Sequence, residues 1–364
     1  MSNEFLNKNV MPWYRWIFSR SDTLPGVTLY FLSKRNSTSP RFFPLYENTS
    51  KVRIVLVRGS RIPHSDFFFI RFIRVILRVF KSKFSQYNFF FSLDIPSSRF
   101  IKTNQILHID DPLYSNYELE QIRNWETCTR DKGFNSRIVV TTEYMRKYFL
   151  QNHIKSEIFI ISQGFSSPEK YSHASDSNEN STFRLVYISP YIDSLGDSHS
   201  GHPMWDASVL IDGIWPEIRT LADIELHLIG RIGGNAAAKL SQSNVFQHGF
   251  ISIAQVAAIL PDFDLALYPR THDNRWQPQK IIEYMGAGVP ILAFDMIDTK
   301  IVEELGIGVL VQNINEFIYK IHELKSNRSS LRVYKQNCLK YRNEYRWSHL
   351  GQELDKILEN SESS

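Results

Sequence analysis

Basic side chains surround the start of a predicted helix in the C-terminal half of the chain. Arg270 and Arg275 occupy a polar loop after a short apolar strand, and Lys280 lies in the first turn of a helix that begins at Pro278. Proline suits this position because its missing N–H would have no partner there. The free amide groups and the dipole of a helix N-terminus attract anions. The sequence therefore predicts a phosphate or diphosphate site, although both arginines are equally compatible with solvated loop residues.

The same helix carries an acidic side chain one turn after its basic one. Glu283 follows Lys280 by three residues, so both project from one helical face. Gln279, just before Lys280, is a further candidate for binding the donor. A carboxylate accepts hydrogen bonds from the vicinal hydroxyls of a ribose, which accompanies the phosphates in a nucleotide. The alternative is an exposed Glu283–Lys280 ion pair, worth about a few tenths of a kcal/mol. Gly230 and Arg231 end another predicted strand and are further donor-site candidates, with a plain turn as the alternative for Arg231.

Short apolar strands alternate with helical segments along both halves of the chain, which predicts parallel sheets covered by helices on both faces. A polar segment with almost no apolar residue separates the halves. We therefore expect an α/β protein with an N-terminal domain over 1–165, a linker over 166–182 and a C-terminal domain over 183–335. A helix over 341–358, apolar along one side, would complete the N-terminal domain.

The predicted helix and its flanks closely resemble a known motif. The stretch from Pro278 to Pro290, PQKIIEYMGAGVP, resembles the P-x-K-x-x-E-Y-M-A-x-G-x-P segment of GT-B glycosyltransferases, especially glycosyltransferase family 4. Five further segments resemble other elements of that family, in the right order. They are IFIISQGF at 158–165, HLIG at 227–230, FQHGF at 246–250, EELGIGVLV at 303–311 and RWS at 346–348. One such match is weak, but six in order indicate the family.

The resemblance implies a GT-B fold, with two Rossmann-like domains facing across a cleft and a C-terminal helix crossing back to the N-terminal domain. It implies retaining transfer of a hexose-type sugar from a UDP- or GDP-linked donor to a glycan or polyprenyl-linked acceptor, as in cell-surface polysaccharide synthesis. No metal or cofactor is expected, because helix dipole and cations stabilise the leaving diphosphate. By this resemblance Glu283 binds the donor ribose, and Lys280 faces the phosphates.

Two departures from the family pattern bear on activity. The family often has a second Glu eight positions before the first, where this chain has Arg275. The Arg and Lys that usually follow the first strand of the C-terminal domain are missing from 187–200, so their role would pass to Arg231, Arg270 or Arg275. The alternative is a catalytically silent GT-B subunit of a glycosylation complex. A nucleotide-sugar epimerase of this architecture would need a second acid cluster near the donor motif, which we do not find.

Candidate catalytic residues follow a predicted strand in the N-terminal half. His108, Asp110 and Asp111 lie at the end of the strand 105–109, just before a proline. An acid at this edge could orient or deprotonate an acceptor hydroxyl, and family members often place a functional His or Asp nearby. The alternative is a strand-end turn, which Asp-Pro commonly forms.

Composition argues against several classes of protein. The net charge of +4, from 42 Lys+Arg against 38 Asp+Glu, is too small to imply a nucleic-acid partner. The only two cysteines, Cys128 and Cys338, are far apart in sequence and suggest a reduced compartment. Neither a signal-peptide layout nor an apolar run of about 18 residues is present. We therefore expect a cytoplasmic protein.

One segment could contact a membrane without crossing it. The run FFFIRFIRVILRVF at 67–80 repeats Arg at helical spacing, and Lys81 continues that stripe. As a helix it would be about 21 Å long, shorter than a hydrocarbon core of about 30 Å. Residues 67–83 therefore predict peripheral contact with an anionic membrane surface. The alternative is a helix buried in the core of the N-terminal domain.

Overall fold

The structure is a computed structural model in which the chain divides into two compact units. One covers Trp16–Ser162 and Gly351–Ser364, and the other covers Met1–Arg15 and Gln163–Leu350. The residues described are 27–33, 52–58, 87–91, 104–109, 116–165, 182–194, 207–221, 223–251, 253–271, 278–346, 349–350 and 352–354. The predicted linker therefore lies outside the described residues except for Thr182, and the predicted domain boundaries stay predictions.

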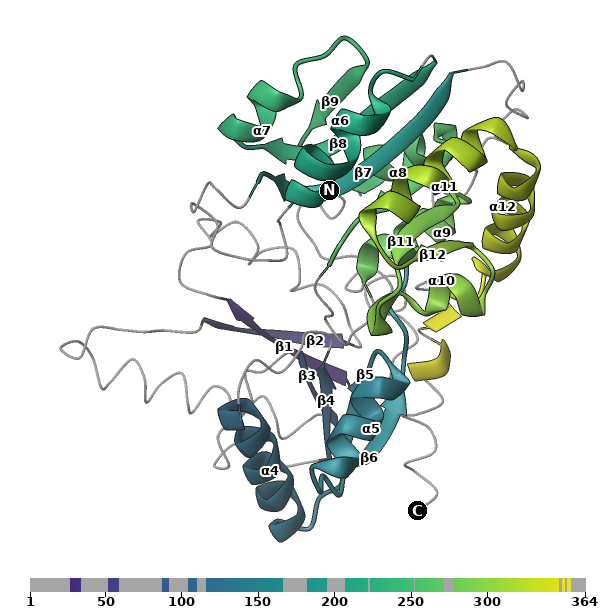
Figure 1. Cartoon of the computed structure of the whole chain (residues 1–364). Helices are drawn as coiled ribbons and strands as arrows, with labels where there is room; N and C mark the ends of the chain where they lie inside the picture. The colour runs from purple at the N-terminus through teal and green to yellow at the C-terminus, as the bar shows by residue number, and fades with distance from the viewer. Residues whose placement is uncertain are drawn as a thin grey trace, which may run out of the picture. The chain divides into compact units, whose positions relative to one another are not determined.

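Six parallel strands form the sheet of the N-terminal unit (Figure 1). Their order across the sheet is β2-β1-β3-β4-β5-β6, and every neighbouring pair is parallel. Their bounds are β1 Val27–Ser33, β2 Val52–Arg58, β3 Tyr87–Phe91, β4 Asn104–Ile109, β5 Ser136–Val140 and β6 Glu157–Ile160. The parallel sheet expected from the apolar runs is thus confirmed.

Two described helices accompany this sheet, α4 (Asn116–Asp131) and α5 (Glu143–Gln151). Helix α5 begins after Thr142, whose hydroxyl oxygen accepts a hydrogen bond from the Met145 nitrogen at 3.2 Å and so satisfies one free amide of the first turn. Met145 and Phe149 lie one turn apart and are buried. Strand β5 is buried along almost its whole length, as a strand covered on both faces must be.

The sheet of the C-terminal unit also has six parallel strands, in the order β12-β11-β10-β7-β8-β9. Their bounds are β7 Phe183–Ile192, β8 Ile224–Ile232, β9 Val245–Gly249, β10 Leu265–Tyr268, β11 Ile291–Phe294 and β12 Gly308–Val311. Counted from β7 as the first strand, this is the order of a dinucleotide-binding Rossmann domain. The strand order reverses between β7 and β10, which makes the gap between these two strands the topological switch point.

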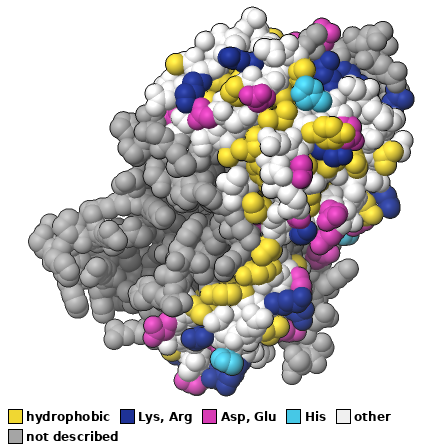
Figure 2. Space-filling view, in the orientation of Figure 1, with side chains coloured by type: hydrophobic (Ala, Val, Ile, Leu, Met, Phe, Trp, Pro, Cys, Tyr) yellow, Lys and Arg dark blue, Asp and Glu magenta, His cyan; other side chains and the backbone are white. Residues whose placement is uncertain are grey.

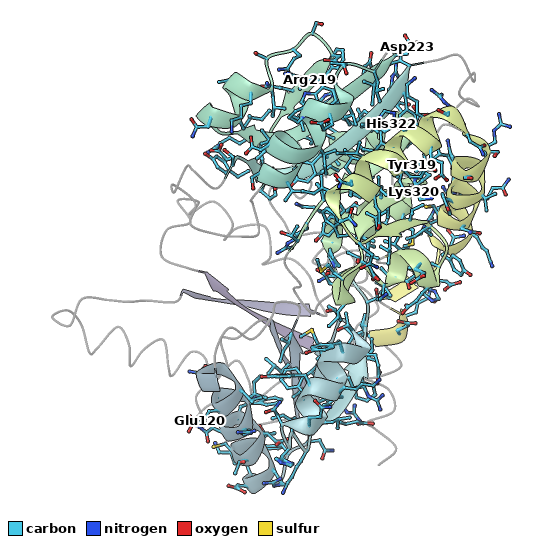
Figure 3. The ribbon with its side chains drawn as sticks, viewed as in Figure 1. Glu120, Arg219, Asp223, Tyr319, Lys320 and His322 are labelled. Atoms are coloured by element: carbon cyan, nitrogen blue, oxygen red, sulfur yellow. The ribbon has the colours of Figure 1, made fainter. Side chains whose placement is uncertain are left out.

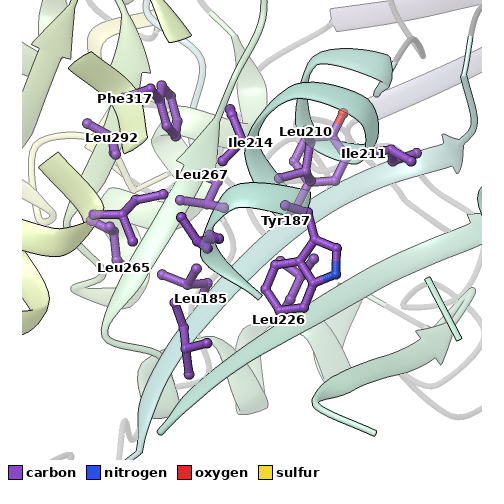
Figure 4. Close-up of a cluster of buried hydrophobic side chains, with 14 of the residues drawn as sticks. Leu185, Tyr187, Leu210, Ile211, Ile214, Leu226, Leu265, Leu267, Leu292 and Phe317 are labelled. Carbon is purple, nitrogen blue, oxygen red and sulfur yellow. The ribbon is translucent and has the colours of Figure 1, made fainter. Parts of the chain in front are cut away.

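Helices cover both faces of this sheet, and each face has its own apolar core (Figure 1). The elements are a π-helical turn at Val209–Ile214, α6 Trp215–Ile218, α7 Gly234–Lys239, α8 Ile253–Ile259, α9 Gln279–Ala287, α10 Ile301–Glu304, α11 Ile314–Ser326 and α12 Ser329–Tyr341. One core joins Leu185, Leu226 and Leu267 of the sheet to Phe317 (Figure 4). Trp215 belongs to the same core. The other core lies beneath α9.

The helix predicted over 341–358 is not continuous. Helix α12 ends at Tyr341 and residues 342–345 form turns; of the later residues that the structure describes, 349–350 and 352–354 are helical. The break has a tertiary cause. The Phe165 nitrogen donates to the Tyr345 carbonyl at 3.0 Å, and Phe165 forms a parallel bridge with Arg346. These contacts hold a series of turns and a single β-bridge where a helix was expected.

The visible surface of the described residues carries acidic and basic side chains interspersed (Figure 2). Helix α11 shows an ordinary surface lysine: the Lys320 ammonium pairs with the Glu323 carboxylate at 2.8 Å, which raises the pKa of Lys320. Its neighbour Tyr319 is 64% exposed (Figure 3). Lys320 and Tyr319 therefore serve as surface counterparts of Lys280 and Tyr284.

Candidate functional site

The switch point of the C-terminal sheet opens because β7 and β10 pair over only two positions, Leu185 with Leu265 and Val186 with Ala266. Beyond them a side chain replaces the ladder, since the Ile188 nitrogen donates to the Tyr284 hydroxyl oxygen at 2.9 Å. Burial raises the pKa of this hydroxyl, which therefore stays neutral. Open α/β sheets bind ligands outside the carboxyl ends of their strands at such a point.

Helix α9 begins at this edge of the sheet, as the sequence predicts. Pro278 is its N-cap and provides no capping side chain, so no side chain of the cap satisfies the first amide groups. The helix ends at Gly288, whose φ of +78° allows the Gly288 nitrogen to bond the Met285 carbonyl at 2.9 Å. Most of the side chains between these ends are buried. The start of α9 is therefore held firmly and can bind an anion.

The two basic residues that the structure describes here both meet tyrosines. The Arg270 Nη1 atom donates to the Tyr268 hydroxyl at 3.2 Å. The Lys280 ammonium lies 5.3 Å from the centre of the Tyr187 ring, within range of a cation–π interaction. Lys280 keeps partial exposure, but its charged end is surrounded by protein, and this burial, together with the nearby Arg270 charge, lowers its pKa to about 7.

Glu283 is held by a glutamine rather than by the lysine one turn before it. The Gln279 amide nitrogen donates to the Glu283 carboxylate at 3.0 Å and to the Gly164 carbonyl at 2.6 Å. Because the ion pairs found among the described residues include none for Lys280, the simple Glu283–Lys280 pair is not what the structure forms. Gln279 fixes Glu283 and also ties α9 to the segment that enters this unit.

Gly230 is required by packing at the end of β8. Its φ is +146°, and a Cβ there would come 1.7 Å from the Ser189 carbonyl oxygen. The close approach arises because β7 changes register between Ile188 and Tyr191. The adjoining Arg231 is exposed and pairs with Tyr191 through the backbone. A role of Gly230 and Arg231 in donor binding stays a prediction.

An acid that the sequence reading missed occupies the segment from which the family's Arg and Lys are absent. Asp193 is buried, and its carboxylate accepts hydrogen bonds from the Tyr191 hydroxyl at 3.0 Å and from the Ser194 and Ala236 nitrogens at 3.0 and 3.4 Å. A Cβ at Gly233 would come 1.7 Å from this carboxylate. Asp193 therefore stabilises the first turn of α7 through a contact that is distant in sequence. No sequence motif around Asp193 indicates this role.

The comparisons with known proteins agree with this architecture. Residues 200–327 match the sequence profile of the family described as glycosyl transferases group 1. No curated protein matches the chain significantly. Among solved structures, sucrose-phosphate synthase from Thermosynechococcus elongatus aligns with a TM-score of 0.61 and 12% identity over 93% of this chain and 89% of that one. Anabaena HepE in complex with UDP-glucose aligns with a TM-score of 0.60 and 14% identity over 92% and 99%.

A glycosyltransferase from Rickettsia africae has a TM-score of 0.62 at 10% identity, over 92% of this chain and 97% of that one. The protein has the GT-B glycosyltransferase fold. The resemblance drawn from PQKIIEYMGAGVP and its companion segments is thereby confirmed at the level of fold, and residues 200–327 are similar to the group 1 family.

Of the predicted acceptor residues of this GT-B protein, the structure describes only the backbone of His108. His108 lies in β4, where its backbone pairs with Val139 and Phe91. Its side chain, Asp110, Asp111, the donor-loop residue Arg275 and the segment 67–83 lie outside what the structure describes. Their roles stay predictions.

In the described part of the chain, no group of three or more His, Cys, Asp or Glu side chains could hold a metal ion. No described helix is both long enough and apolar enough to pass through a bilayer.

Proposed function

We propose that this GT-B protein is a retaining, metal-independent hexosyltransferase that uses a UDP- or GDP-linked sugar as donor. The observation that carries the proposal is the arrangement at the switch point, where the uncapped start of α9 lies with Lys280 and Arg270 at the carboxyl edge of the sheet. A helix N-terminus with two cations suits the diphosphate of a nucleotide-sugar. The complex of the related HepE fold with UDP-glucose supports the same class of donor.

The remaining donor contacts follow from the geometry of α9. Glu283 lies one turn into the helix and accepts a hydrogen bond from Gln279, and a carboxylate at this place can accept hydrogen bonds from ribose hydroxyls. Arg275, Gly230 and Arg231 are the other donor-binding candidates.

The chemistry requires little from the protein beyond charge and position. The bond between the sugar C1 and the diphosphate oxygen breaks, the diphosphate keeps the electron pair, and an acceptor hydroxyl forms the new bond to C1. The cations and the helix dipole stabilise the charge that develops on the diphosphate. The acceptor proton passes to a base, for which His108, Asp110 and Asp111 are the candidates.

The acceptor in this proposal is a glycan or a polyprenyl-linked sugar, in a pathway that builds a cell-surface polysaccharide. The basic and aromatic segment 67–83 supports a cytoplasmic protein bound peripherally to an anionic membrane. Vesicle flotation with and without anionic lipid tests this part, and equal binding to neutral vesicles would contradict it.

A thermal-shift screen with UDP-glucose, UDP-galactose, GDP-mannose and dTDP-glucose tests donor binding. A ligand at about 100 times its Kd stabilises a protein by about 2.7 kcal/mol, which gives a measurable rise in Tm. Glu283→Ala removes charge-assisted hydrogen bonds worth about 1.5–3 kcal/mol, so it should weaken binding about 10- to 100-fold. The control is Glu120→Ala on α4 (Figure 3), an exposed helical glutamate of the other unit. Unchanged donor transfer in Glu283→Ala would refute the site.

The second candidate is a catalytically silent GT-B subunit, which the buried Asp193 favours. An acid rather than cations occupies the segment after β7, so one customary source of diphosphate binding is absent. Calorimetry distinguishes the two: a silent subunit binds none of the nucleotide-sugars, whereas the enzyme binds at least one.

A further inference from the structure

Two cations share the start of α9, and among the described residues neither of them is paired with a carboxylate. Lys280 and Arg270 are close enough for the Arg270 charge to lower the pKa of Lys280. Within the described residues neither forms an ion pair, and the buried Arg270 Nε atom has no hydrogen-bond partner. Elsewhere in the same unit the lysines Lys239, Lys300 and Lys320 each pair with an acid.

None of the described groups that surround Lys280 forms an ion pair with its ammonium. Tyr187 of β7 presents its ring face, at 5.3 Å. Tyr268 of β10 accepts from Arg270 at 3.2 Å, and burial raises its pKa so that it remains a neutral phenol. On α9 itself, Tyr284 bonds the Ile188 backbone and Glu283 accepts from Gln279. Among the described residues Lys280 therefore has the Tyr187 ring and the Arg270 charge as its neighbours, while the Asp298 carboxylate acts on Tyr268.

Lys280 and Arg270 repel each other, and only the lysine can end this repulsion by losing its proton. A guanidinium stays protonated under all ordinary conditions, whereas a buried ammonium can lose its proton. Burial and the Arg270 charge lower the pKa of Lys280 to about 7, so near neutral pH a large share of the empty sites carries a neutral lysine. A bound dianion would reverse this balance, because it stabilises the charged ammonium.

We propose that Lys280 takes up a proton when the diphosphate of the donor binds, so that affinity for the nucleotide-sugar is linked to pH. This inference rests on the proposed function, because it assumes that the anion at the start of α9 is the donor diphosphate. The empty site keeps one fixed charge on Arg270 and gains the second only when the ligand arrives.

The sign of the linkage follows from which state binds the proton. Below pH 6 the lysine is charged in both the free and bound protein, and affinity does not change with pH. Above pH 7 the free protein must gain a proton to bind, so affinity falls by up to about tenfold per pH unit. For a free-state pKa of about 7, uptake is about 0.1 proton at pH 6 and about 0.9 proton at pH 8.

Isothermal titration calorimetry tests the inference with UDP-glucose and GDP-mannose as probes. Their diphosphate is esterified at both ends and lacks the terminal phosphate ionisation near pH 6. Titrations at pH 6, 7, 8 and 8.5, each in buffers of different ionisation enthalpy, give the number of protons taken up. We expect the Kd of the native protein to rise about 10- to 20-fold between pH 7 and 8.5.

Lys280→Arg is the decisive variant, because arginine keeps its charge throughout this range. Its Kd should stay constant from pH 6 to 8.5, with no proton uptake. Lys320→Arg, on α11 and paired with Glu323, should behave as the native protein does. Should Lys280→Arg fold poorly, Arg270→Gln gives a second test: removing the neighbouring charge should move the midpoint of the pH dependence of Kd upward. An unmoved midpoint would overturn the inference.

The outcomes separate this inference from the proposed function. Binding of either probe with a pH-independent Kd and no proton uptake overturns the inference and leaves donor binding standing. Failure of all nucleotide-sugars to bind at every pH instead overturns the proposed function.

Discussion

The Tyr284 hydroxyl oxygen lies 2.9 Å from the Ile188 nitrogen, and this contact closes the inner end of the switch point. Ile188 belongs to β7, which has lost its β10 partner two residues earlier. A buried backbone N–H without a partner is costly, so the tyrosine of the EYM segment completes the sheet where the ladder stops. The same side chain anchors α9, whose start carries the candidate donor site.

Tyr284→Phe should therefore destabilise the protein. Removing the hydroxyl leaves the Ile188 N–H unsatisfied in a partly buried position, at a cost of about 1 kcal/mol or more. Urea unfolding measures this loss as a lower midpoint with an unchanged slope. Tyr319→Phe, on the exposed side of α11, should leave the midpoint within about 0.5 kcal/mol of the native value. Equal midpoints for the two variants would show that the hydroxyl contact contributes nothing.

Gly286→Ala tests the packing of α9 against the segment that enters the C-terminal unit. A Cβ at Gly286 would come 2.3 Å from the Phe165 ring, so the ring or the helix must shift, at a cost of about 1–3 kcal/mol. We expect a lower thermal midpoint. Gly234→Ala in α7 is the matched control, because a Cβ there meets nothing within 4 Å. Alanine also favours a helix more than glycine does, so a Gly234→Ala protein should be as stable as the native one or more so.

Helix α9 could be predicted from sequence because its limits are local. Pro278 at the start and Gly288 at the end mark the boundaries by backbone chemistry alone, and the structure places the helix between them. The partners of its side chains could not be predicted in the same way. Spacing left an ion pair between Glu283 and Lys280 open as the alternative to donor binding, but Glu283 accepts from Gln279, and Lys280 lies over the ring of Tyr187 in β7.

Contacts distant in sequence also explain the two largest surprises. The helix expected over 341–358 is interrupted because Tyr345 and Arg346 pair with Phe165, and helical periodicity carries no sign of such a partner. Asp193 was overlooked because its contact with the start of α7, through the Ala236 nitrogen, joins residues 43 positions apart. In both cases the local pattern is sound, and tertiary contacts decide the outcome.

Gln279 is predicted to act on donor binding through Glu283. Its amide donates both to Gly164 and to Glu283, so Gln279→Glu places a carboxylate against the Gly164 carbonyl and the Glu283 carboxylate. We expect Gln279→Glu to weaken nucleotide-sugar binding more than Gln279→Ala does, because like charges add repulsion to the lost hydrogen bonds. Calorimetry at pH 7 measures the difference. Equal affinity in both variants would mean that Gln279 does not orient Glu283.

The buried lysine should also leave a signature in the stability of the ligand-free protein. The pKa of Lys280 is about 7 when folded and returns to its usual value near 10.5 when unfolded. Between these values the unfolded chain holds more protons, so the free energy of unfolding should rise with pH, by up to about 1.4 kcal/mol per pH unit from this group. Lys280→Met should remove that contribution and stabilise the protein more at pH 6 than at pH 9.

Urea unfolding at pH 6, 7, 8 and 9 measures the slope. Lys320→Met is the control, because Glu323 raises the pKa of Lys320. The stabilisation from this pair is fully present below pH 10.5, the usual lysine pKa, and is lost only as the pH passes the raised pKa of the folded protein. Between pH 6 and 9 it therefore does not change. The slope for Lys320→Met should therefore equal the native slope. If the free energy of unfolding of Lys280→Met changed with pH as steeply as that of the native protein, the Lys280 ammonium would be charged in the folded protein too. A lysine that is charged in both states contributes nothing to this pH dependence.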